Sequence, residues 1–327
     1  MKEKILRILK ENPDDFISGE AISEKFDVSR SAVWKHINTL KEEGYEIESQ
    51  TRKGYRLVSS PDILTLSEIE ECLDTDFIGR NIYYFENLSS TNIKAKEIAM
   101  EVKEGSIIIS EEQTKGKGRL GRNWTSPKGK GIWMSIILKP DLEPMEVAKL
   151  TLIGAAAVHQ GLMEMGIKSQ IKWPNDIIIE KKKVCGILTE MSCELNIINY
   201  CIMGIGINVN LDAKDFPKEL ENKATSLKIS TGKKINRKLL LANILNHFEK
   251  LYIPFVENRD ISKSIEISRE NSILLGENIR IIRGDTEKIG KAIDIDNEGQ
   301  LIVELENGNI EKVFSGEVSI RGMEGYI

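Results

Sequence analysis

The sequence predicts an α+β protein of three parts, and this prediction rests on the spacing of its apolar residues. Apolar side chains recur at helical spacing over residues 1–60, strands and helices alternate through the middle of the chain, and short alternating strands follow from about residue 273. We therefore expect a helical N-terminal domain over 1–60, a central mixed-sheet α/β domain over 61–272 and a small C-terminal β-barrel over 273–327. The 327 residues are enough for two or three domains.

The composition is that of a soluble globular protein. Hydrophobic residues make up 40% of the chain and charged residues 30%, with a net charge of -5. No apolar run approaches the roughly 18 residues that a membrane span needs, and the N-terminus lacks a signal-peptide pattern. The three isolated histidines indicate no protein-built metal site. Four cysteines without a Cys-x-x-Cys pair lie among apolar neighbours, so we expect reduced core thiols and a cytoplasmic location: Cys72, Cys185, Cys193 and Cys201.

The N-terminal part has the pattern of a winged helix-turn-helix. An apolar stripe from Ile5 to Leu9 predicts a first helix, and a second helix covers residues 19–26. Ser29 is a suitable N-cap for a third helix over 30–43. Residues 45–57 then read as a hairpin, the wing.

Positive charge on the third helix and the wing indicates DNA binding. Lys plus Arg and Asp plus Glu are equal over residues 1–60, at 11 each, so a helical interaction module without DNA is the alternative. Clustering of the cations where phosphates would lie favours DNA. The candidate DNA-binding residues are Ser29, Arg30, Ser31, Lys35, His36, Asn38, Arg52 and Lys53.

The central part is expected to alternate strands and helices after a linker at residues 59–61. Strands are predicted over 82–85, 106–113, 131–138 and 199–210, with a hairpin over 172–189. Helices are predicted over 66–73, after the segment 89–92 to about 102, and over 145–165, 237–252 and 261–269, with a loop over 211–230. The C-terminal strands are expected at 277–283, 289–296, 301–306 and 310–314, separated by Asn-Gly-type turns.

A glycine-rich cationic loop over residues 113–124 is the most distinctive segment. It reads Q-T-K-G-K-G-R-L-G-R-N-W, and no acidic residue lies between Glu112 and Asp141. Glycine lets a ligand approach the main chain closely, and the cations suit a polyanion; a solvated surface loop is the alternative. No helix follows the glycines, which excludes a dinucleotide fingerprint. A second cationic segment reads I-K-W-P-N-D at 171–176 and K-V-C-G-I-L at 183–188.

Three ordered blocks, G-K-G-R-L-G-R-N-W, K-W-P-N-D and K-V-C-G-I-L-T-E, resemble the signature of biotin–protein ligases. With S-R-S-A-V-W-K-H-I in the third helix, the chain resembles the two-function form of that family, which also represses the biotin operon. The resemblance implies a class II synthetase-like central domain and an SH3-like C-terminal barrel. Two departures are mild: Lys117 stands where arginine is common, and Leu120 where a basic residue often stands.

The resemblance also implies the reaction and its partners. ATP and biotin would be substrates, with Mg²⁺ arriving with ATP, and biotinoyl-5'-AMP would be the intermediate. Biotin would pass to a lysine of a biotin carboxyl carrier protein domain. Operator DNA and a homodimer loaded with biotinoyl-AMP would be the other partners, with no membrane involved.

The site residues follow from the same resemblance. Lys183 and Arg119 would be catalytic, although Lys183 alternatively belongs to a solvated lysine turn. Biotin would be bound by Ser90, Thr91, Asn92, Gln113, Lys117, Gly118, Arg119 and Lys183. The nucleotide would be bound by Arg122, Lys172, Asn175, Asp176 and Asn208. Trp124 and Trp173 are either core residues or walls of the site, and core is expected for Trp173.

Two other functions stay open from the sequence. One is a transcription regulator whose α/β domain senses a small acid without ligase activity. The other is a lipoate or octanoyl ligase, because that family shares the fold. The form of the glycine–arginine loop and the fused winged helix count against the second.

Overall fold

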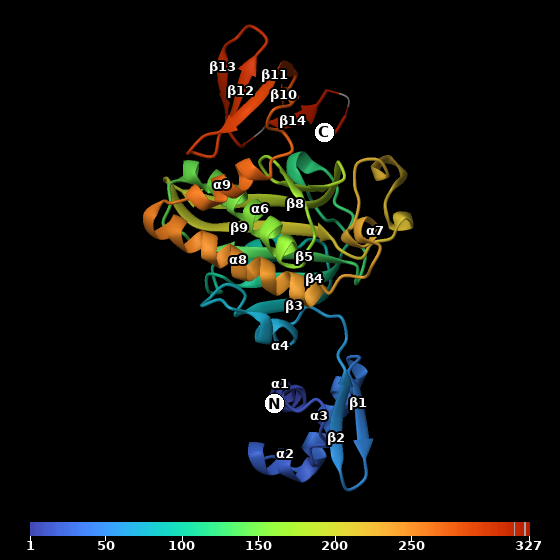
Figure 1. Ribbon diagram of the computed structural model, residues 1–327. Coiled ribbons are helices and arrows are strands. Elements are labelled where there is room, and N and C mark those ends of the chain that lie inside the picture. Colours follow the sequence, from blue (N-terminus) through green and yellow to red (C-terminus); the bar gives the residue numbers. More distant parts are fainter. Residues whose placement is uncertain (317, 324) are drawn as a thin grey trace. The chain divides into compact units, whose positions relative to one another are not determined.

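The computed structural model describes residues 1–316, 318–323 and 325–327, and the chain divides into two compact units, Met1–Glu71 and Cys72–Ile327 (Figure 1). The first unit includes residues 61–71 in addition to the predicted domain 1–60. Within this added segment, Glu68 accepts a hydrogen bond from the Tyr45 hydroxyl at 2.8 Å and pairs with Lys10 at 2.7 Å. The C-terminal strands belong to the second compact unit together with the central sheet.

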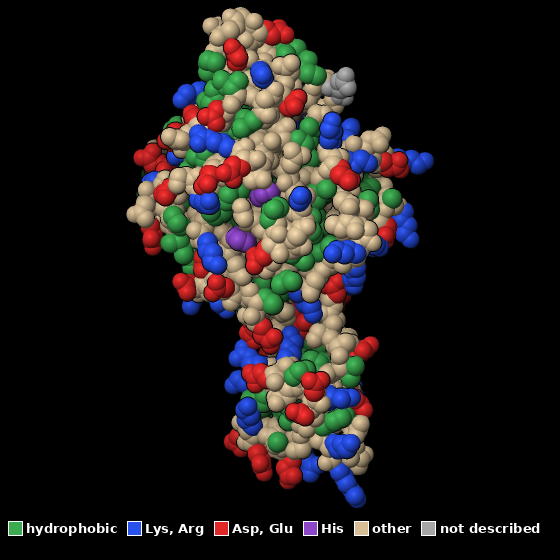
Figure 2. Space-filling model, viewed as in Figure 1, with side chains coloured by type: hydrophobic (Ala, Val, Ile, Leu, Met, Phe, Trp, Pro, Cys, Tyr) green, Lys and Arg blue, Asp and Glu red, His purple; other side chains and the backbone are tan. Residues whose placement is uncertain are grey.

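The N-terminal unit has the predicted winged helix-turn-helix order of elements. It contains α1 (Lys2–Glu11), α2 (Gly19–Phe26), α3 (Arg30–Glu42), β1 (Glu46–Gln50) and β2 (Gly54–Ser59). The Ser29 hydroxyl accepts a hydrogen bond from the Ala32 amide and so caps α3. Val33, Ile37 and Leu40 face a buried core that α1 and α2 complete, so the outer face of α3 remains exposed. Charges of both signs are interspersed over this unit on the face shown in Figure 2.

One expected helix is shorter than its apolar pattern indicates. Residues 66–73 contain α4 (Leu66–Ile69), a single turn that passes directly into a 3₁₀ turn over Glu70–Cys72.

The second unit is built on a seven-stranded mixed sheet in the order β3-β4-β5-β9-β8-β7-β6. Its strands are β3 (Ile82–Leu88), β4 (Ile107–Gln113), β5 (Gly131–Leu138), β6 (Gln170–Lys172), β7 (Asp176–Ile179), β8 (Lys182–Glu194) and β9 (Ile197–Asn208). β3 and β4 are parallel, and the other neighbours are antiparallel. The expected mixed sheet is thus confirmed, although the segment expected as one hairpin over 172–189 supplies three strands.

Helices cover both faces of this sheet. They are α5 (Thr91–Ile98), α6 (Val147–Glu164), α7 (Leu227–Thr231), α8 (Arg237–Asn258) and α9 (Ser262–Glu270). Figure 1 shows α6 and α8 side by side along one face. Gly154 of α6 lies against Met203 of β9, whereas the next strand residue, Gly204, lies against Asn92 of α5. Since successive strand residues point to opposite faces, α5 lies on the face away from α6.

Several boundaries differ from the sequence expectation. α5 ends at Ile98 rather than near 102, and α7 forms inside the expected loop, where Ser226 caps it by accepting from the Ile229 amide. α8 continues beyond 252 to Asn258 across Pro254, because Phe255 of its last turns packs into the core with 0% exposure.

The C-terminal strands form a five-stranded antiparallel sheet in the order β13-β12-β11-β10-β14. They are β10 (Asn278–Arg283), β11 (Thr286–Ile295), β12 (Leu301–Leu305), β13 (Ile310–Val313) and β14 (Ser319–Gly322). The antiparallel C-terminal module is confirmed, but β14 was not expected. Among the described residues no pairing joins β13 to β14, so hydrogen bonding does not close the sheet into a ring.

The cysteines are free, as expected, but only half of them are core residues. Cys185 and Cys201 are buried, whereas Cys72 and Cys193 are exposed, which corrects the expectation of four core thiols. None of the helices in the described ranges is long and apolar enough to cross a membrane.

Candidate active site

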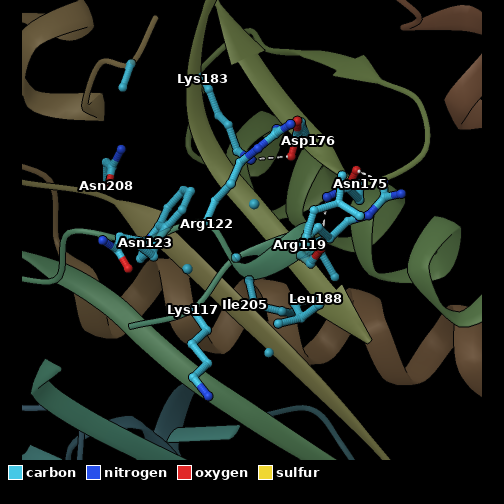
Figure 3. Close-up of a pocket in the computed structure, with 18 of the residues that line it drawn as sticks. Lys117, Arg119, Arg122, Asn123, Asn175, Asp176, Lys183, Leu188, Ile205 and Asn208 are labelled. Atoms are coloured by element: carbon cyan, nitrogen blue, oxygen red, sulfur yellow. Dashed lines mark hydrogen bonds and ion pairs between the residues drawn. The ribbon is translucent and has the colours of Figure 1, made fainter. Parts of the chain in front are cut away.

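A cavity of about 440 Å³ lies in the second unit, lined by residues of α5, the glycine loop, β7, β8, β9 and the C-terminal module. Figure 3 shows part of this lining. Every residue expected from the sequence to bind biotin or nucleotide lines it. These are Ser90, Thr91, Asn92, Gln113, Lys117, Gly118, Arg119, Arg122, Lys172, Asn175, Asp176, Lys183 and Asn208. The sequence blocks that lie far apart in the chain are therefore brought together in one place.

Glycines of β8 and β9 make room for the cavity. A Cβ atom at Gly204 would collide with the Asn92 amide, and one at Gly206 would lie 2.6 Å from Trp124 Nε1. A Cβ at Gly186 would lie 2.8 Å from Lys183 Nζ. The role of these strand glycines as the floor of the cavity becomes visible only in the fold.

One end of the cavity is lined mainly by uncharged polar groups, with the ion pair of Glu190 and Lys96 behind Asn92. The backbone N–H of Thr91 and its hydroxyl donate to Gln113 Oε1 at 2.8 and 3.2 Å, and Gln113 Nε2 donates to Ser126 Oγ at 3.0 Å. Ser90 occupies the N-cap position of α5 but makes no capping bond with its side chain. Ser90 therefore keeps its hydroxyl available to the cavity.

The Asn92 amide is held on both sides by side chains that sequence reasoning missed. Asn92 Oδ1 accepts from the Ser135 hydroxyl at 2.6 Å, and Nδ2 donates to Glu190 Oε2 at 2.8 Å. Lys96 Nζ lies 2.6 Å from the other oxygen of Glu190. Burial pushes the pKa of Glu190 upward, but Lys96 and Asn92 outweigh burial and hold it below its usual value. Asn92 is thus fixed in orientation, and the charge of Glu190 is neutralised by Lys96.

The glycine loop is closed by its own backbone. The Gly118 N–H donates to the Arg122 carbonyl at 2.7 Å, and the Trp124 N–H donates to Gly116 at 2.9 Å. Leu120, at the position where the resembling family often has a basic residue, has φ 56° and is 58% exposed. Its left-handed backbone is uncommon for a residue with a side chain and lets the loop turn sharply.

Arg119 and Lys117 point in different directions, although the resemblance assigns both to the same acid group. Arg119 Nη1 donates to Asn175 Oδ1 at 2.8 Å, and its Nη2 donates to the carbonyls of Gly316 and Val318 in the C-terminal module. Burial lowers the pKa of Arg119. Lys117 is exposed and points away from this group in Figure 3. Arg119 therefore links the loop to the residue before β7 and to the segment between β13 and β14.

The other end of the cavity is crowded with charge. Lys183 Nζ lies 2.5 Å from Asp176 Oδ1, and the Tyr326 hydroxyl donates to Asp176 Oδ2. Lys183 also lies over the Trp124 ring, 5.1 Å from its centroid. Lys183 points into the cavity, so it is not part of a solvated lysine turn. Burial opposes ionisation of Asp176, but Lys183, Tyr326 and Lys172 outweigh it and keep its pKa below the usual value.

Lys172 is the most deeply buried cation of this end, with 3% exposure. Its Nζ donates to the Tyr326 carbonyl at 2.6 Å and lies 3.5 Å from the centroid of the Tyr326 ring. Burial lowers the pKa of Lys172 to about 7, against the opposing effect of Asp176. Arg321 lies 4.9 Å from the same ring, so the Tyr326 ring lies among cations.

The remaining predicted residues have structural bonds inside the cavity wall. Asn175 donates to the Ile187 carbonyl while accepting from Arg119, and Asn208 donates to the Thr225 carbonyl at 3.1 Å. Trp173 is 2% exposed and its Nε1 donates to the Gly299 carbonyl, as expected for a core residue that also borders the site.

The candidate DNA-binding residues lie on the outer face of α3 and on the wing. Arg30, Ser31, Lys35, Arg52 and Lys53 are exposed, as is Ser29, whereas His36 and Asn38 are half-buried. Trp34, which the sequence analysis did not select, is 59% exposed on the same helix.

Comparisons with known proteins agree with this arrangement. Three family models match in order: an HTH domain over residues 2–56, the biotin/lipoate A/B protein ligase family over 84–208 and the biotin protein ligase C terminal domain over 274–321. The bifunctional ligase/repressor BirA of Bacillus subtilis is 42% identical, covering 98% of both chains, and that of Escherichia coli is 27% identical over 95% of this chain and 94% of its own.

Among solved structures, the biotin protein ligase of Aquifex aeolicus in complex with biotin and ATP has a TM-score of 0.65. It is 32% identical and covers 74% of this chain and 99% of its own. The cavity, the ordered domains and the near full-length relationship lead to one conclusion: the chain belongs to the biotin/lipoate A/B protein ligase family, in its bifunctional ligase/repressor branch.

Proposed function

We propose that this protein is an ATP-dependent biotin–protein ligase that is also a biotin-responsive transcriptional repressor. The observation that carries the ligase proposal is the cavity itself, which joins an uncharged polar end to a cationic end. A ureido ring with a carboxylate tail would fit this polarity, with the ring among hydrogen-bonding groups and the tail pointing to the cations. The three domains are proposed at 1–60, 61–272 and 273–327.

The uncharged end would bind the ring of biotin. Ser90, Thr91 and Gln113 offer hydroxyl, amide and carbonyl groups that complement a ureido group. Asn92, whose amide is already engaged on both sides, supports this surface rather than adding a free donor. Lys117 and Gly118 would flank the acid tail.

The cationic end would stabilise the charge that develops during adenylation. The biotin carboxylate attacks the α-phosphorus of ATP, the bond to the β-phosphate oxygen breaks and pyrophosphate leaves. Negative charge spreads over the phosphate oxygens, where fixed cations are most effective. Lys183 and Arg119 would act at the reacting carboxylate and α-phosphate, with Arg122, Lys172, Asn175, Asp176 and Asn208 around the nucleotide.

Transfer completes the reaction. The lysine amine of a carrier domain attacks the carbonyl carbon of the mixed anhydride, AMP leaves and the amine loses a proton. An amide bond replaces the anhydride, so no oxidant or reductant is needed.

Magnesium would enter with the nucleotide rather than bind in a protein cage. No group of three His, Cys, Asp or Glu side chains able to hold a metal occurs among the described residues, and Asp176 is the one carboxylate among the described cavity-lining residues. A single carboxylate that is already paired with lysine supplies too few ligands for a protein-held ion, which fits a magnesium ion bound mainly by phosphate oxygens. Mg²⁺ would supply charge neutralisation at those oxygens.

Repression would use the N-terminal unit and a homodimer. The exposed face of α3 and the wing present cations and hydrogen-bonding groups suited to operator DNA. Met191, Leu195 and Ile197, which are 44%, 96% and 69% exposed, form an apolar tip on the β8–β9 hairpin that suits self-association. We propose that biotinoyl-AMP orders the glycine loop, favours the dimer and so tightens operator binding. The free cysteines fit a cytoplasmic location.

One incubation tests the ligase proposal. The protein is mixed with ATP, Mg²⁺, biotin and a biotin carboxyl carrier domain, and the acceptor is analysed by mass spectrometry. Biotin attached to one lysine is expected. An unmodified acceptor would leave a ligand-sensing regulator as the better description, and modification by lipoate in place of biotin would identify the alternative ligase.

Sedimentation and operator binding, each with and without biotinoyl-AMP, test the repressor proposal. Because coupling between sites is reciprocal, operator DNA should tighten the dimer as the adenylate does. Equal self-association and equal operator affinity in both conditions would refute the coupling.

A further inference from the structure

Tyr326 lies at the centre of the cationic end, although no sequence motif of the site includes it. Its hydroxyl donates to Asp176, its backbone carbonyl accepts from Lys172, and its ring covers the Lys172 ammonium at 3.5 Å. Gly325 forms an isolated bridge with Gly322 at the end of β14, which folds the following residue back toward the site. Two side-chain contacts and one backbone contact thus fix Tyr326 against two residues expected to meet the nucleotide.

These contacts extend to Lys183. Asp176 has two oxygens, one bonded to Tyr326 and the other 2.5 Å from Lys183 Nζ. The series runs from Lys172 through Tyr326 and Asp176 to Lys183, across β6, β7 and β8. Burial and the neighbouring Asp176 raise the pKa of Tyr326, so its hydroxyl keeps the proton that it donates.

We propose that Tyr326 is a positioning residue for the phosphate end of the reaction, which holds Lys172 directly and Lys183 through Asp176. The inference rests on the proposed ligase function and adds to it a residue of the C-terminal module. The physical reason is preorganisation: cations fixed before the reaction need no reorganisation when charge develops on phosphate. Loss of the hydroxyl would leave Asp176 with one partner fewer and free Lys183 to move.

Two variants separate the contacts of Tyr326. Tyr326→Phe removes the hydroxyl and keeps the ring and the backbone carbonyl, whereas Tyr326→Ala also removes the ring from Lys172. Tyr83→Phe, an identical change at a 39% exposed tyrosine of β3 outside the cavity, is the matched control. Thermal unfolding of all three variants reports whether the fold is retained.

Initial rates of biotin-dependent ATP–pyrophosphate exchange give the kinetic readout. For Tyr326→Phe we expect kcat to fall about tenfold, the size expected for one hydrogen bond to a charged group. The KM for biotin should stay within twofold, because the polar end is untouched. Tyr326→Ala should in addition raise the KM for ATP, and Tyr83→Phe should match the wild type.

Two results would overturn the inference. If Tyr326→Phe keeps kcat and both KM values within twofold, the residue merely covers the cavity. If its KM for ATP falls while kcat is retained, Tyr326 competes with the nucleotide instead of positioning the cations.

Calorimetric titration with Mg-ATP in the absence of biotin separates this inference from the ligase proposal. Weaker binding to Tyr326→Ala than to wild type supports the positioning of Lys172 even if the wild type shows no biotin-dependent exchange, a result that would reject only the ligase proposal. Equal binding by wild type and Tyr326→Ala would count against the positioning itself.

Discussion

At one end of the cavity, Thr91, Asn92 and Gln113 are joined to Ser126 and Ser135 by hydrogen bonds between uncharged groups. At the other end, Lys172 and Lys183 face Asp176 and Tyr326, with ionised groups taken largely out of water. Hydrogen bonds between neutral groups tolerate burial because each partner is satisfied. The repulsion between the buried cations Lys172 and Lys183 is offset by the negative charge of Asp176, which lies beside them.

The difference between the two ends indicates that substrate recognition and the chemical step take place at opposite ends of the cavity. A rigid uncharged end can select a substrate by shape and hydrogen bonding without changing its reactivity. A cationic end stabilises a polyanionic transition state more than the neutral part of a substrate. Changes at the uncharged end should therefore act on biotin binding, and changes at the charged end on the rate of adenylation.

The largest effect is expected for Lys183→Ala. Removing a cation aimed at the developing charge should lower kcat for adenylation about a hundredfold or more, while biotin affinity changes far less. Single-turnover adenylation and biotin titration measure the two quantities. Lys182→Ala is the control, because Lys182 donates to the Glu221 carbonyl and does not line the cavity. Equal losses in rate and affinity would show that Lys183 only binds substrate.

Arg119→Gly should release biotinoyl-adenylate before transfer. The variant loses the bonds from Arg119 to Asn175 and to the Gly316 and Val318 carbonyls, which link the loop to the rest of the site. A loop that retains a reactive intermediate keeps it from water and from foreign amines. Labelling of bystander lysines should rise several-fold, scored by streptavidin blotting. Labelling confined to the carrier domain would refute retention by this loop.

Asn92→Ala should act at the uncharged end alone. It removes one of the two hydrogen bonds of the Ser135 hydroxyl, which keeps its bond to Thr91, and one partner of the half-buried Glu190 carboxylate. The groups that shape this end would therefore lose their fixed orientation. The KM for biotin should rise roughly tenfold, with kcat within a few-fold. Asn87→Ala on β3 is the control, because Asn87 Nδ2 donates to Glu112 in an exposed hydrogen bond. A fall in kcat at unchanged KM would contradict the division between the two ends.

A smaller effect is expected from pH at the charged end. The pKa of Lys172, lowered by burial to about 7, means that its ammonium loses its proton as pH rises through neutrality. Asp176 opposes this shift, while Arg321, Lys183 and Arg122 strengthen it. ATP binding should therefore weaken by a few-fold between about pH 6 and pH 8, measured by calorimetry. Lys172→Arg, which stays charged, should remove the dependence; an unchanged pH profile in that variant would assign it to another group.

Local sequence patterns predicted much of the fold and of the site. The Ser29 cap and apolar periodicity identified α3, and alternating patterns identified most strands, because these signals lie within a few residues of one another. The glycine loop was found through its contiguous block of charge and glycine, whereas the role of Lys183 followed from the family resemblance. All the residues named for biotin and nucleotide line one cavity.

Residues that act across long sequence separations were missed. Tyr326 meets Asp176 from 150 positions away, and Glu190 meets Asn92 from 98. Tyr326 belongs to none of the sequence blocks. Glu190 ends the block K-V-C-G-I-L-T-E but was given no role, because its partner Asn92 lies 98 positions away. The strand β14, which brings Arg321 to the site, was not predicted either.

Pyrophosphate exchange with two competing acids tests the central claim most directly, namely that an uncharged end selects biotin and a charged end activates it. The protein is incubated with ATP, Mg²⁺ and labelled pyrophosphate, with biotin, with lipoate or with neither acid. Label should enter ATP with biotin and remain near background in the other two samples. Exchange that proceeds equally without an acid, or equally with lipoate, would contradict the account.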